Sequence, residues 1–397
     1  MKVNHYKVII VGGGPAGMAA ALQVARRTPA IAQEMLILEA AEHPRPKLCG
    51  GGITFHGEAQ LQQLGIRIDV PAFQVSKLMF RLAPHNFVIN QPNAMRIVER
   101  AAFDAALARA VTDRQLCLHS NEKVLDIGLE GDGLLLTTTC GCYRADLVVA
   151  ADGANSTIRR KLGLRSTLGV ARLLRVLVPV PPAEQAAWAT HPVLFDFSPV
   201  RAGIQGYAWD FPCIINHQPC MNYGIFDSRV VQQPRKLRPG NAAGEHGHLK
   251  QVFADYLQER KIDIEAVELH GHPVRWFNPK AEFARTRVLL TGDAAGVDPL
   301  FAEGISYAME YGAIVAEAIE DAFLRNDFSL HSYRTRLLTH RLSMSLRRRA
   351  AVARQFYRFR HPWFWSLLWQ AAAIAPAVVN QAIGAALDVL PPAHKRQ

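Results

Sequence analysis

The sequence lacks the patterns that mark secreted, disulfide-stapled or metal-binding proteins. Its six cysteines, spread over 397 residues, follow no framework spacing, which favours free thiols in a reducing compartment. The one close pair, Cys140-Gly-Cys142, has no second pair or histidine cluster to complete a metal site, so we expect a hairpin turn there and no metal. The chain enters an apolar strand at about Lys7, which leaves no room for a signal peptide, and we expect a cytoplasmic location.

Acidic residues are scarce at the C-terminal end. From His331 to Gln397 the chain has 11 Lys and Arg residues but one acid, Asp388, so this segment carries most of the net charge of +11. Any function of the excess positive charge is therefore expected to lie in this segment. With 49% hydrophobic and 20% charged residues, the composition is that of an ordinary globular enzyme, long enough for two domains or one composite domain.

The first strand, turn and helix carry a nucleotide-binding pattern. Residues 7–11 are a short Val- and Ile-rich run, typical of a strand buried on both faces. The turn that follows has the spacing G-x-G-x-x-G and opens an Ala-rich helix, and its predicted cofactor-binding residues are Gly12, Gly14, Ala16 and Gly17. Glu39 ends a second apolar run 22 residues after Gly17, where a carboxylate can accept from both ribose hydroxyls of an adenosine. Together these features predict a dinucleotide site.

A loop rich in proline, glycine and cations covers residues 43–54. It lies just past the end of the ribose-binding strand, so it can run along the cofactor towards the reactive end. We expect its cations to meet phosphate or flavin oxygens and its glycines to lie flat against a ring; the residues concerned are Arg45, Lys47, Gly50 and Gly51. Cys49 would then be an active-site thiol beside that ring. The alternative is a small buried hydrophobic side chain.

Three further positions point to the same site. Arg100 begins a helix expected over residues 98–110 and would place a cation near the cofactor, the alternative being a solvated helix charge. Two more apolar strands end in an acid and a glycine, at Asp152-Gly153 and at Gly292-Asp293, as in the ligand crevice of an open α/β sheet. Residues 116–119, 123–129 and 134–139 are expected to form a small β-meander.

The chain after Gly292 can reach both halves of a flavin. Asp293 can bind the ribityl hydroxyls. A helix that begins near Gly304 and Ile305 can place its N-terminus beneath the N1 and C2 carbonyl of the isoalloxazine, where the positive end of the helix dipole favours the anionic reduced ring.

The middle of the chain, residues 170–282, contains short strands separated by turn residues. This pattern predicts an antiparallel sheet, which we interpret as a substrate domain inserted between parts of the cofactor domain. Tyr207, Trp209 and Phe211 alternate along one strand, so a period of two puts all three on one face. That face is either a substrate cavity or ordinary core.

The three strand ends, taken in order over about residues 6 to 320, resemble the flavoprotein class that includes aromatic hydroxylases of the p-hydroxybenzoate type. The resemblance implies an α/β fold class. FAD would lie in a split, Rossmann-like domain with a three-layer parallel sheet, beside an antiparallel β-sheet substrate domain, and a helical segment would follow. The expected boundaries are 1–72, 91–168 and 283–328 for the FAD-binding domain, 73–90 and 169–282 for the substrate domain, and 329–397 for the C-terminal helical region.

Two stretches narrow the resemblance. Residues 44–52 are similar to the P-x-x-K-x-C-G-G loop of geranylgeranyl reductases, although here the second proline, Pro46, directly precedes Lys47. Residues 207–212 are similar to the Y-x-W-x-F-P motif of the same family. In that family reduced FAD saturates isoprenoid double bonds, and the reductant is NAD(P)H or a ferredoxin. The resemblance implies catalytic roles for Cys49, Tyr207 and Trp209, and a substrate cavity lined by Tyr207, Trp209 and Phe211. We also expect Pro299 to line that cavity.

The C-terminal piece combines basic and aromatic residues. An Arg-dense run from Arg334 to Arg360 is expected to be helical, with Arg334, Arg341 and Arg348 nearly on one face. An apolar stretch over 362–390 follows, with Trp363, Trp365 and Trp369. It is long enough to cross a bilayer, but Pro376 and polar residues interrupt it, so a helix pair in an anionic membrane interface fits better. The alternative is a helical cap over the substrate cavity.

These observations support several hypotheses about the function, which we rank as follows. The first is an FAD-dependent reductase acting on C=C bonds of an isoprenoid or other lipid-like substrate. The alternative is an FAD-dependent monooxygenase, that is, a hydroxylase or epoxidase. A halogenase fits less well, because Tyr207 and Phe211 replace two positions of the W-x-W-x-I-P type motif. The flavin pattern disfavours a nucleic-acid-binding role, while the basic segment could dock an acidic electron-donor protein.

Overall fold

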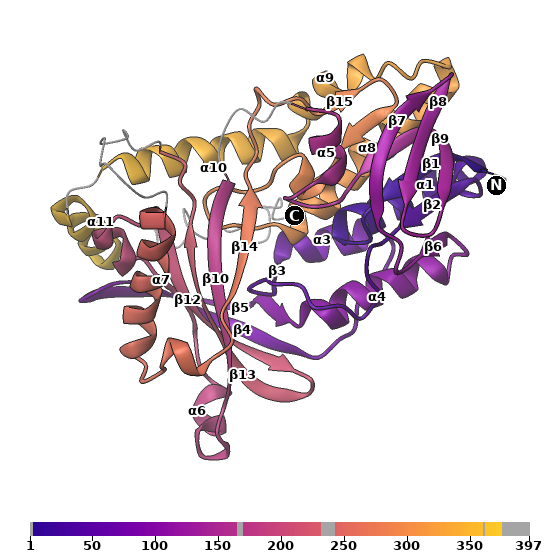
Figure 1. Cartoon of the computed structure of the whole chain (residues 1–397). Helices are drawn as coiled ribbons and strands as arrows, with labels where there is room; N and C mark the ends of the chain where they lie inside the picture. Colours follow the sequence, from indigo (N-terminus) through magenta and orange to yellow (C-terminus); the bar gives the residue numbers. More distant parts are fainter. Residues whose placement is uncertain (1–2, 165–169, 232–242, 360–361, 375–397) are drawn as a thin grey trace, which may run out of the picture.

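The computed structural model describes residues 3–164, 170–231, 243–359 and 362–374 (Figure 1). Two eight-stranded sheets form its framework, and helices pack around and between them. The predicted fold class, an α/β chain with a largely parallel sheet, a second antiparallel sheet and C-terminal helices, is confirmed. Arg360 and the predicted apolar stretch beyond Ile374 lie outside the described residues.

Sheet A has the strand order β15-β16-β9-β1-β2-β6, with the β7–β8 hairpin added to β9. Its strands are β1 (Asn4–Val11), β2 (Met35–Leu38), β6 (Cys117–His119), β7 (Val124–Glu130), β8 (Gly133–Thr138), β9 (Cys142–Ala150), β15 (Ala284–Arg285) and β16 (Val288–Leu290). The four neighbours β16, β9, β1 and β2 are parallel, and their last residues are buried. Their carboxyl ends therefore meet at one edge.

The expected meander is only partly correct. β7 and β8 form a hairpin, and residues 139–141 make the predicted turn into β9. β6 instead pairs in parallel with β2. Helix α4 (Arg100–Thr112) precedes β6 and returns the chain to the same end of the sheet, as a parallel pairing requires.

The helices next to sheet A pack tightly because small residues face one another. They are α1 (Pro15–Arg27), α2 (Pro29–Ala32), α3 (Phe55–Gln63), α4, α5 (Thr157–Lys161) and α8 (Ile305–Arg325). α1 lies directly against α8, and a Cβ atom on Gly312 of α8 would come within 2.8 Å of the backbone of Ala19. This close approach holds the N-termini of both helices at the same edge of the sheet.

Sheet B has the order β14-β10-β13-β12-β11-β4-β5-β3. Its strands are β3 (Gly52–Thr54), β4 (Ala72–Leu82), β5 (His85–Val98), β10 (Val170–Pro179), β11 (Val193–Asp196), β12 (Gly206–Ile215), β13 (Gln218–Asp227) and β14 (His270–Arg275). The pairing is antiparallel as predicted, except that β11 and β4 run parallel. Short helical segments lie between these strands: Pro182–Glu184, α6 (Gln185–Trp188), Ser198–Ala202 and Ile264–Ala266. A further segment, Gly292–Ala294, follows β16 of sheet A.

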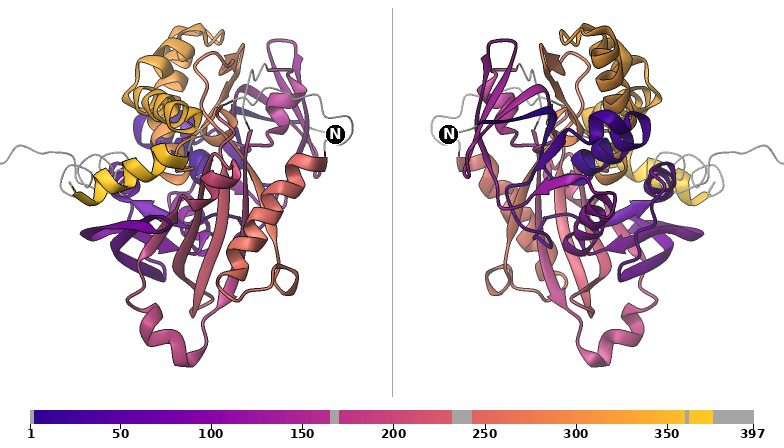
Figure 2. Two further views of the ribbon diagram at one scale, coloured as in Figure 1. Left: turned by 90° about the vertical axis from the view of Figure 1, so that its left-hand side faces the viewer. Right: turned by 90° about the vertical axis from the view of Figure 1, so that its right-hand side faces the viewer.

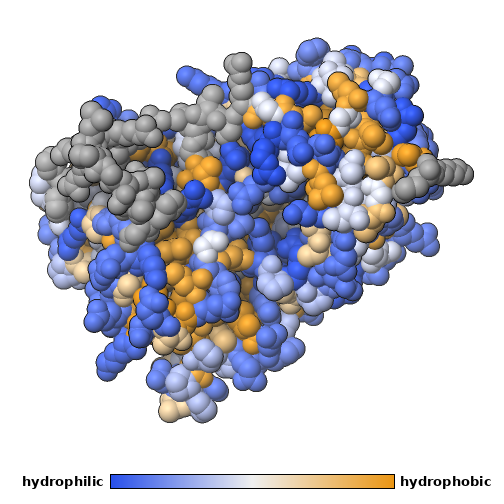
Figure 3. Space-filling view, viewed as in Figure 1, coloured by the Kyte–Doolittle hydropathy of each residue, from blue (hydrophilic) through white to orange (hydrophobic). Residues whose placement is uncertain are grey.

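The two faces of sheet B have different neighbours. Helix α7 (Ala243–Gln258) covers one face, where Phe253 packs with Ala208 and Ile225 in a separate hydrophobic cluster (Figure 2). Part of this cluster reaches the surface, and hydrophobic residues gather around α7 in the space-filling view (Figure 3). Because side chains alternate along β12, Tyr207 and Trp209 point to the opposite face, towards sheet A.

The C-terminal helices are α9 (His331–Thr339), α10 (Arg341–Arg358) and α11 (Pro362–Ile374). The prediction that Arg334, Arg341 and Arg348 lie on one face of a single helix is wrong, because the run forms two helices. The run breaks at His340, which has extended backbone and accepts from the N–H of Leu342 through Nδ1 at 3.1 Å, so it caps α10. Several arginines bind the body instead: Arg334 donates to the carbonyl of Ala281, and Arg341 to Glu310. Among the described residues, no helix is both long and apolar enough to cross a bilayer.

Candidate active site

A cavity of about 460 Å³ lies where the carboxyl edge of sheet A faces sheet B. Most of the predicted site residues line it: Gly12, Gly14, Ala16, Glu39, Arg45, Lys47, Cys49, Gly50, Gly51, Arg100, Asp152, Gly153, Tyr207, Trp209, Phe211, Asp293, Gly304 and Ile305. Gly17, Gly292 and Pro299 are buried behind the wall and do not line it. We predicted Pro299 as a residue of the substrate cavity, but the structure does not place it on the cavity surface.

The first turn needs its glycines. Gly12 has φ +109°, and a Cβ atom there would come within 2.4 Å of the Ala151 carbonyl oxygen. A Cβ on Gly17 would lie 1.9 Å from the Gly12 carbonyl oxygen. The turn is therefore drawn tightly between β1 and β9, and α1 begins at the cavity with Gly14 as an N-cap that has no capping side chain.

Glu39 is fixed at the end of β2. One carboxylate oxygen accepts from the N–H of Gly13 at 2.7 Å and the other from that of Ala41 at 3.0 Å. Arg45 reaches across to it, with Nε 3.2 Å from Oε1, and its Nη1 lies 3.4 Å from Asp104. The carboxylate thus faces the cavity where the first turn begins α1, the position that a ribose requires.

Arg100 is buried rather than solvated. Its guanidinium donates to both carboxylate oxygens of Asp104 at 3.0 Å, and Asp104 is fully buried. Burial alone would lower the pKa of Arg100, but Asp104 and the nearby Cys49 thiol outweigh it and raise that pKa. The site therefore holds a permanent positive charge next to the cysteine loop.

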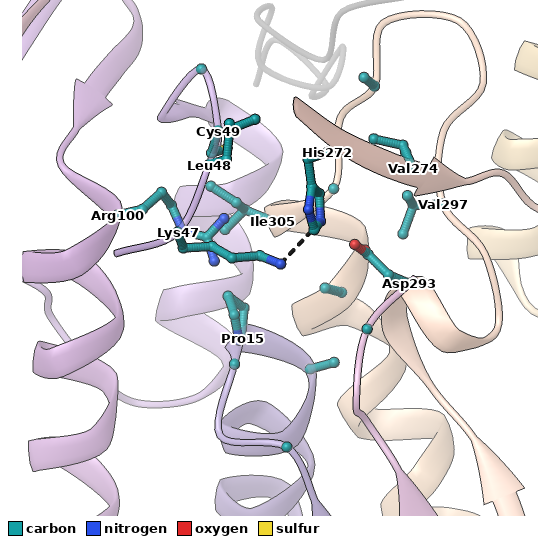
Figure 4. A pocket seen from close by; sticks show the side chains of 18 of the residues that line it. Pro15, Lys47, Leu48, Cys49, Arg100, His272, Val274, Asp293, Val297 and Ile305 are labelled. Atoms are coloured by element: carbon teal, nitrogen blue, oxygen red, sulfur yellow. Dashed lines mark hydrogen bonds between the residues drawn. The ribbon is translucent and has the colours of Figure 1, made fainter. Parts of the chain in front are cut away.

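Lys47 crosses the cavity (Figure 4). Its Nζ lies 3.0 Å from Nε2 of His272 on β14, and Asp293 stands nearby at the end of β16. Burial lowers the pKa of Lys47 and, with the positive charges of Lys47 and Arg100, lowers that of His272 to about 4. Burial also raises the pKa of Asp293. Near neutral pH His272 is thus uncharged and accepts from Lys47.

The Cys49 loop is held from sheet B. The Cys49 carbonyl accepts from Nδ2 of Asn222 at 3.0 Å and from Nη1 of Arg175 at 3.3 Å. Asn222 in turn accepts from the indole N–H of Trp209 at 3.0 Å. The Cys49 sulfur accepts from the Gly51 N–H at 3.3 Å and is only partly buried. Its place on the wall disfavours the alternative of an inert core side chain.

The aromatic residues form one wall. Tyr207 and Trp209 have ring centroids 6.2 Å apart, and Trp209 and Phe211 6.0 Å apart. Phe195 of β11 packs against both ends of this row, 5.3 Å from Tyr207 and 5.2 Å from Phe211. The Tyr207 hydroxyl donates to the Phe301 carbonyl at 2.6 Å. The three predicted residues therefore pack on one another and also line the cavity.

Sequence reasoning missed His272, Arg175 and Asn222. They stand on strands that lack a recognisable motif and meet the loop only through the sheet pairing. A weak signal was present for His272, because the alternation of His272 with Val274 and Trp276 continues a buried face.

The cavity fits FAD by the chemistry of its walls. Two helix N-termini, those of α1 and α8, open onto it, and each has a glycine N-cap without a capping side chain. Asp152 contributes Oδ1, a buried oxygen for which the described part of the chain provides no hydrogen-bond partner. One end of the cavity is thus suited to a diphosphate and ribose, and the other to a flat, partly apolar ring.

Comparison with known proteins defines the class first. The family described as FAD binding domain matches residues 5–319, which cover both the sheet A edge and the cavity, so the fold and site are those of an FAD-dependent oxidoreductase. The chain belongs to this family and, within it, to the geranylgeranyl reductase family.

Similar proteins support this assignment. A digeranylgeranylglycerophospholipid reductase 2 of Methanopyrus kandleri is 30% identical over 344 residues, which cover 82% of this chain and 79% of that protein. A menaquinone reductase of Mycolicibacterium smegmatis is 29% identical over 335 residues, 78% of this chain and 75% of its own. The solved structure of a geranylgeranyl bacteriochlorophyll reductase-like protein from Thermoplasma acidophilum has the same fold, with a TM-score of 0.70, 20% identity and coverage of 90% and 88%.

Proposed function

We propose that the protein is a reductase that saturates C=C bonds of an isoprenoid or other lipid-like substrate. The observation that carries the proposal is the shared cavity, in which the flavin-binding edge and the Cys49 loop face the aromatic wall of β12. An apolar wall suits a long hydrocarbon chain. The relatives named as reductases of menaquinone and of digeranylgeranylglycerophospholipid point to the same substrate class.

The predicted residues would each bind a different part of the cofactor. We infer that the first turn, with the N-terminus of α1, binds the diphosphate, and that Glu39 accepts from the adenosine ribose. Asp293 and the N-terminus of α8 would receive the ribityl chain and the ring. The ring would be flanked by loop residues that line the same cavity: Lys47, Gly50, Gly51 and Arg100.

The reaction adds one hydride and one proton across a double bond. FAD held in this cavity would, in its reduced form, supply the hydride. Cys49, which lines the cavity, would donate a proton from Sγ to one carbon of that bond, and water would then return a proton to the sulfur. Tyr207 and Trp209 would hold the chain in place and exclude water, because both rings are fixed by hydrogen bonds.

The reductant and the membrane contact belong to this proposal as well. NAD(P)H or a ferredoxin would reduce the flavin, and Arg347 and Arg348, which are exposed on α10, offer positive charge to an acidic donor protein. A peripheral position on an anionic membrane would bring the enzyme to a lipid substrate, with α11 as the contact surface.

Turnover without oxygen tests the proposal against its alternative. The FAD-loaded enzyme is reduced with dithionite and mixed anaerobically with geranylgeranyl diphosphate or menaquinone as probes. We expect mass spectrometry to find a product that has gained two hydrogen atoms for each bond reduced. A product that forms only when oxygen is admitted, and that contains an added oxygen atom, would instead identify a monooxygenase.

A further inference from the structure

One arginine from the C-terminal helices is buried against the cavity. Arg349 of α10 has a side chain that is 4% exposed. Its Nη1 donates to Asp298 at 2.8 Å, its Nη2 lies 3.2 Å from Glu303, and its guanidinium stands 5.2 Å from the ring centroid of Tyr307. It is thus a cation shared by two carboxylates. Its position falls outside residues 5–319, which the FAD-binding family covers.

The loop that Arg349 holds is part of the active-site wall. Asp298 is fully buried and accepts from the N–H groups of Leu300 at 2.8 Å and Phe301 at 3.0 Å, which fixes the loop's shape. Residues 301–304 of this loop line the cavity and lead into the N-terminus of α8. The Phe301 carbonyl of this loop also accepts a hydrogen bond from the Tyr207 hydroxyl, so the loop connects the aromatic wall to α8.

The charges of this loop matter to a bound flavin. Glu303 lines the cavity, and its second carboxylate oxygen accepts from the Thr54 hydroxyl at 2.7 Å. A buried carboxylate without a cation leaves a large local field, because little water is present to screen it. Reduction adds negative charge to a flavin, so the carboxylate charge of Glu303 on the wall opposes reduction, and the positive charge of Arg349 offsets part of that opposition.

We propose that Arg349 is a positioning residue of the active site, which raises the reduction potential of bound FAD by offsetting the charge of Glu303 and by holding the loop that leads into α8. The C-terminal helix α10 would then be a working part of the flavin site and not only a cover. The inference rests on FAD binding in this cavity but not on the substrate, so it holds equally for a reductase and a monooxygenase.

The test compares the reduction potentials of FAD bound to the wild type and to five variants, one of which is a control. Each protein is first shown by its absorbance to hold FAD, and is then equilibrated anaerobically with a reference dye. Arg349→Met should lower the ratio of reduced to oxidised flavin at least tenfold, which is about 30 mV for a two-electron couple. Arg349→Lys should recover part of the loss, because it restores the charge but not both contacts.

Two further variants separate charge from shape. Glu303→Gln alone should shift the potential upwards, and Glu303→Gln combined with Arg349→Met should return it towards the wild-type value. The matched control is Arg348→Met, which removes the same charge from an exposed neighbour on the same helix and should leave the potential unchanged.

The proposal is overturned if Arg349→Met keeps its FAD at the wild-type potential, or if Arg348→Met shifts the potential as much. Should Arg349→Met fail to fold or to hold FAD, Glu303→Gln decides: an unchanged potential in that variant overturns the proposal. A wild-type protein that takes up no flavin refutes FAD binding itself, and so is distinct from these outcomes.

Discussion

Cys49 is held in place by groups that take no part in its chemistry. Its backbone carbonyl is bound by Arg175 and Asn222 from two strands of sheet B, and its sulfur accepts from the N–H of Gly51. Removing the sulfur loses the contact with Gly51 but keeps the backbone contacts with Arg175 and Asn222, which hold the loop. This separation makes the thiol a sharp test of mechanism at the scale of one residue.

Replacing Cys49 by Ala should leave the FAD content unchanged and lower turnover by roughly 100-fold or more, the usual contribution of a positioned proton donor. Turnover is measured anaerobically with prereduced enzyme, so that only the reaction with substrate is followed. Cys140→Ala is the matched control, because Cys140 is an exposed thiol in the turn between β8 and β9. If Cys49→Ala turned over at the wild-type rate, the thiol would have no role in the reaction.

At the residue scale, local spacing predicted the positions that meet at the sheet edge. Glu39, Asp152 and Asp293 each follow a buried apolar strand, and parallel strands bring such ends together. His272 and Arg349 could not be predicted in the same way. His272 reaches the cavity from β14, and only the alternation along that strand hints at it. Arg349 reaches the loop before α8 from α10 through tertiary packing, and nothing in its local sequence marks it.

At the scale of elements, strands were predicted better than the C-terminal helices. Alternating and continuous apolar patterns determine which faces of a strand are buried, and strands predicted from these patterns are present in both sheets. The seven-residue spacing of Arg334, Arg341 and Arg348 assumed one continuous helix, and the cap at His340 turns the chain between the first two. Arginine spacing alone carries no information about such a break.

Helix α11 is apolar on two faces. Trp365 and Trp369 are buried, and the indole N–H of Trp369 lies 3.4 Å from the Phe80 carbonyl oxygen of sheet B. On the other face Trp363 and Leu367, four residues apart, are 63% and 54% exposed. Aromatic and aliphatic side chains exposed on one face of a helix are typical of a helix that lies in a membrane interface.

The double variant Trp363→Ser, Leu367→Ser should lose most of the protein's binding to vesicles of phosphatidylcholine and phosphatidylglycerol, because burial of these side chains supplies the apolar part of the affinity. Flotation at moderate salt measures it. Leu324→Ser is the control, since Leu324 is 80% exposed but lies on α8. Wild-type protein that stays unbound under these conditions would remove the membrane hypothesis and leave α11 as a cap on sheet B.

At the scale of the whole molecule, residues from both sheets form one site. Sheet A provides the strand ends and helix N-termini that suit a dinucleotide, and sheet B provides the aromatic wall and the strands that hold the cysteine loop. The C-terminal helices close the arrangement from outside, with Arg349 reaching the loop before α8. The site is therefore complete only when segments from most of the chain are assembled.

The account depends on FAD lying along this cavity with its ring beside Cys49, and a crystal structure of the FAD-loaded protein tests that most directly. We predict the adenosine ribose at Glu39, the ribityl chain at Asp293, and the isoalloxazine between residues 49–51 and the N-terminus of α8. A flavin whose ring lies away from the cysteine loop, or a folded protein that takes up no flavin at all, would contradict it.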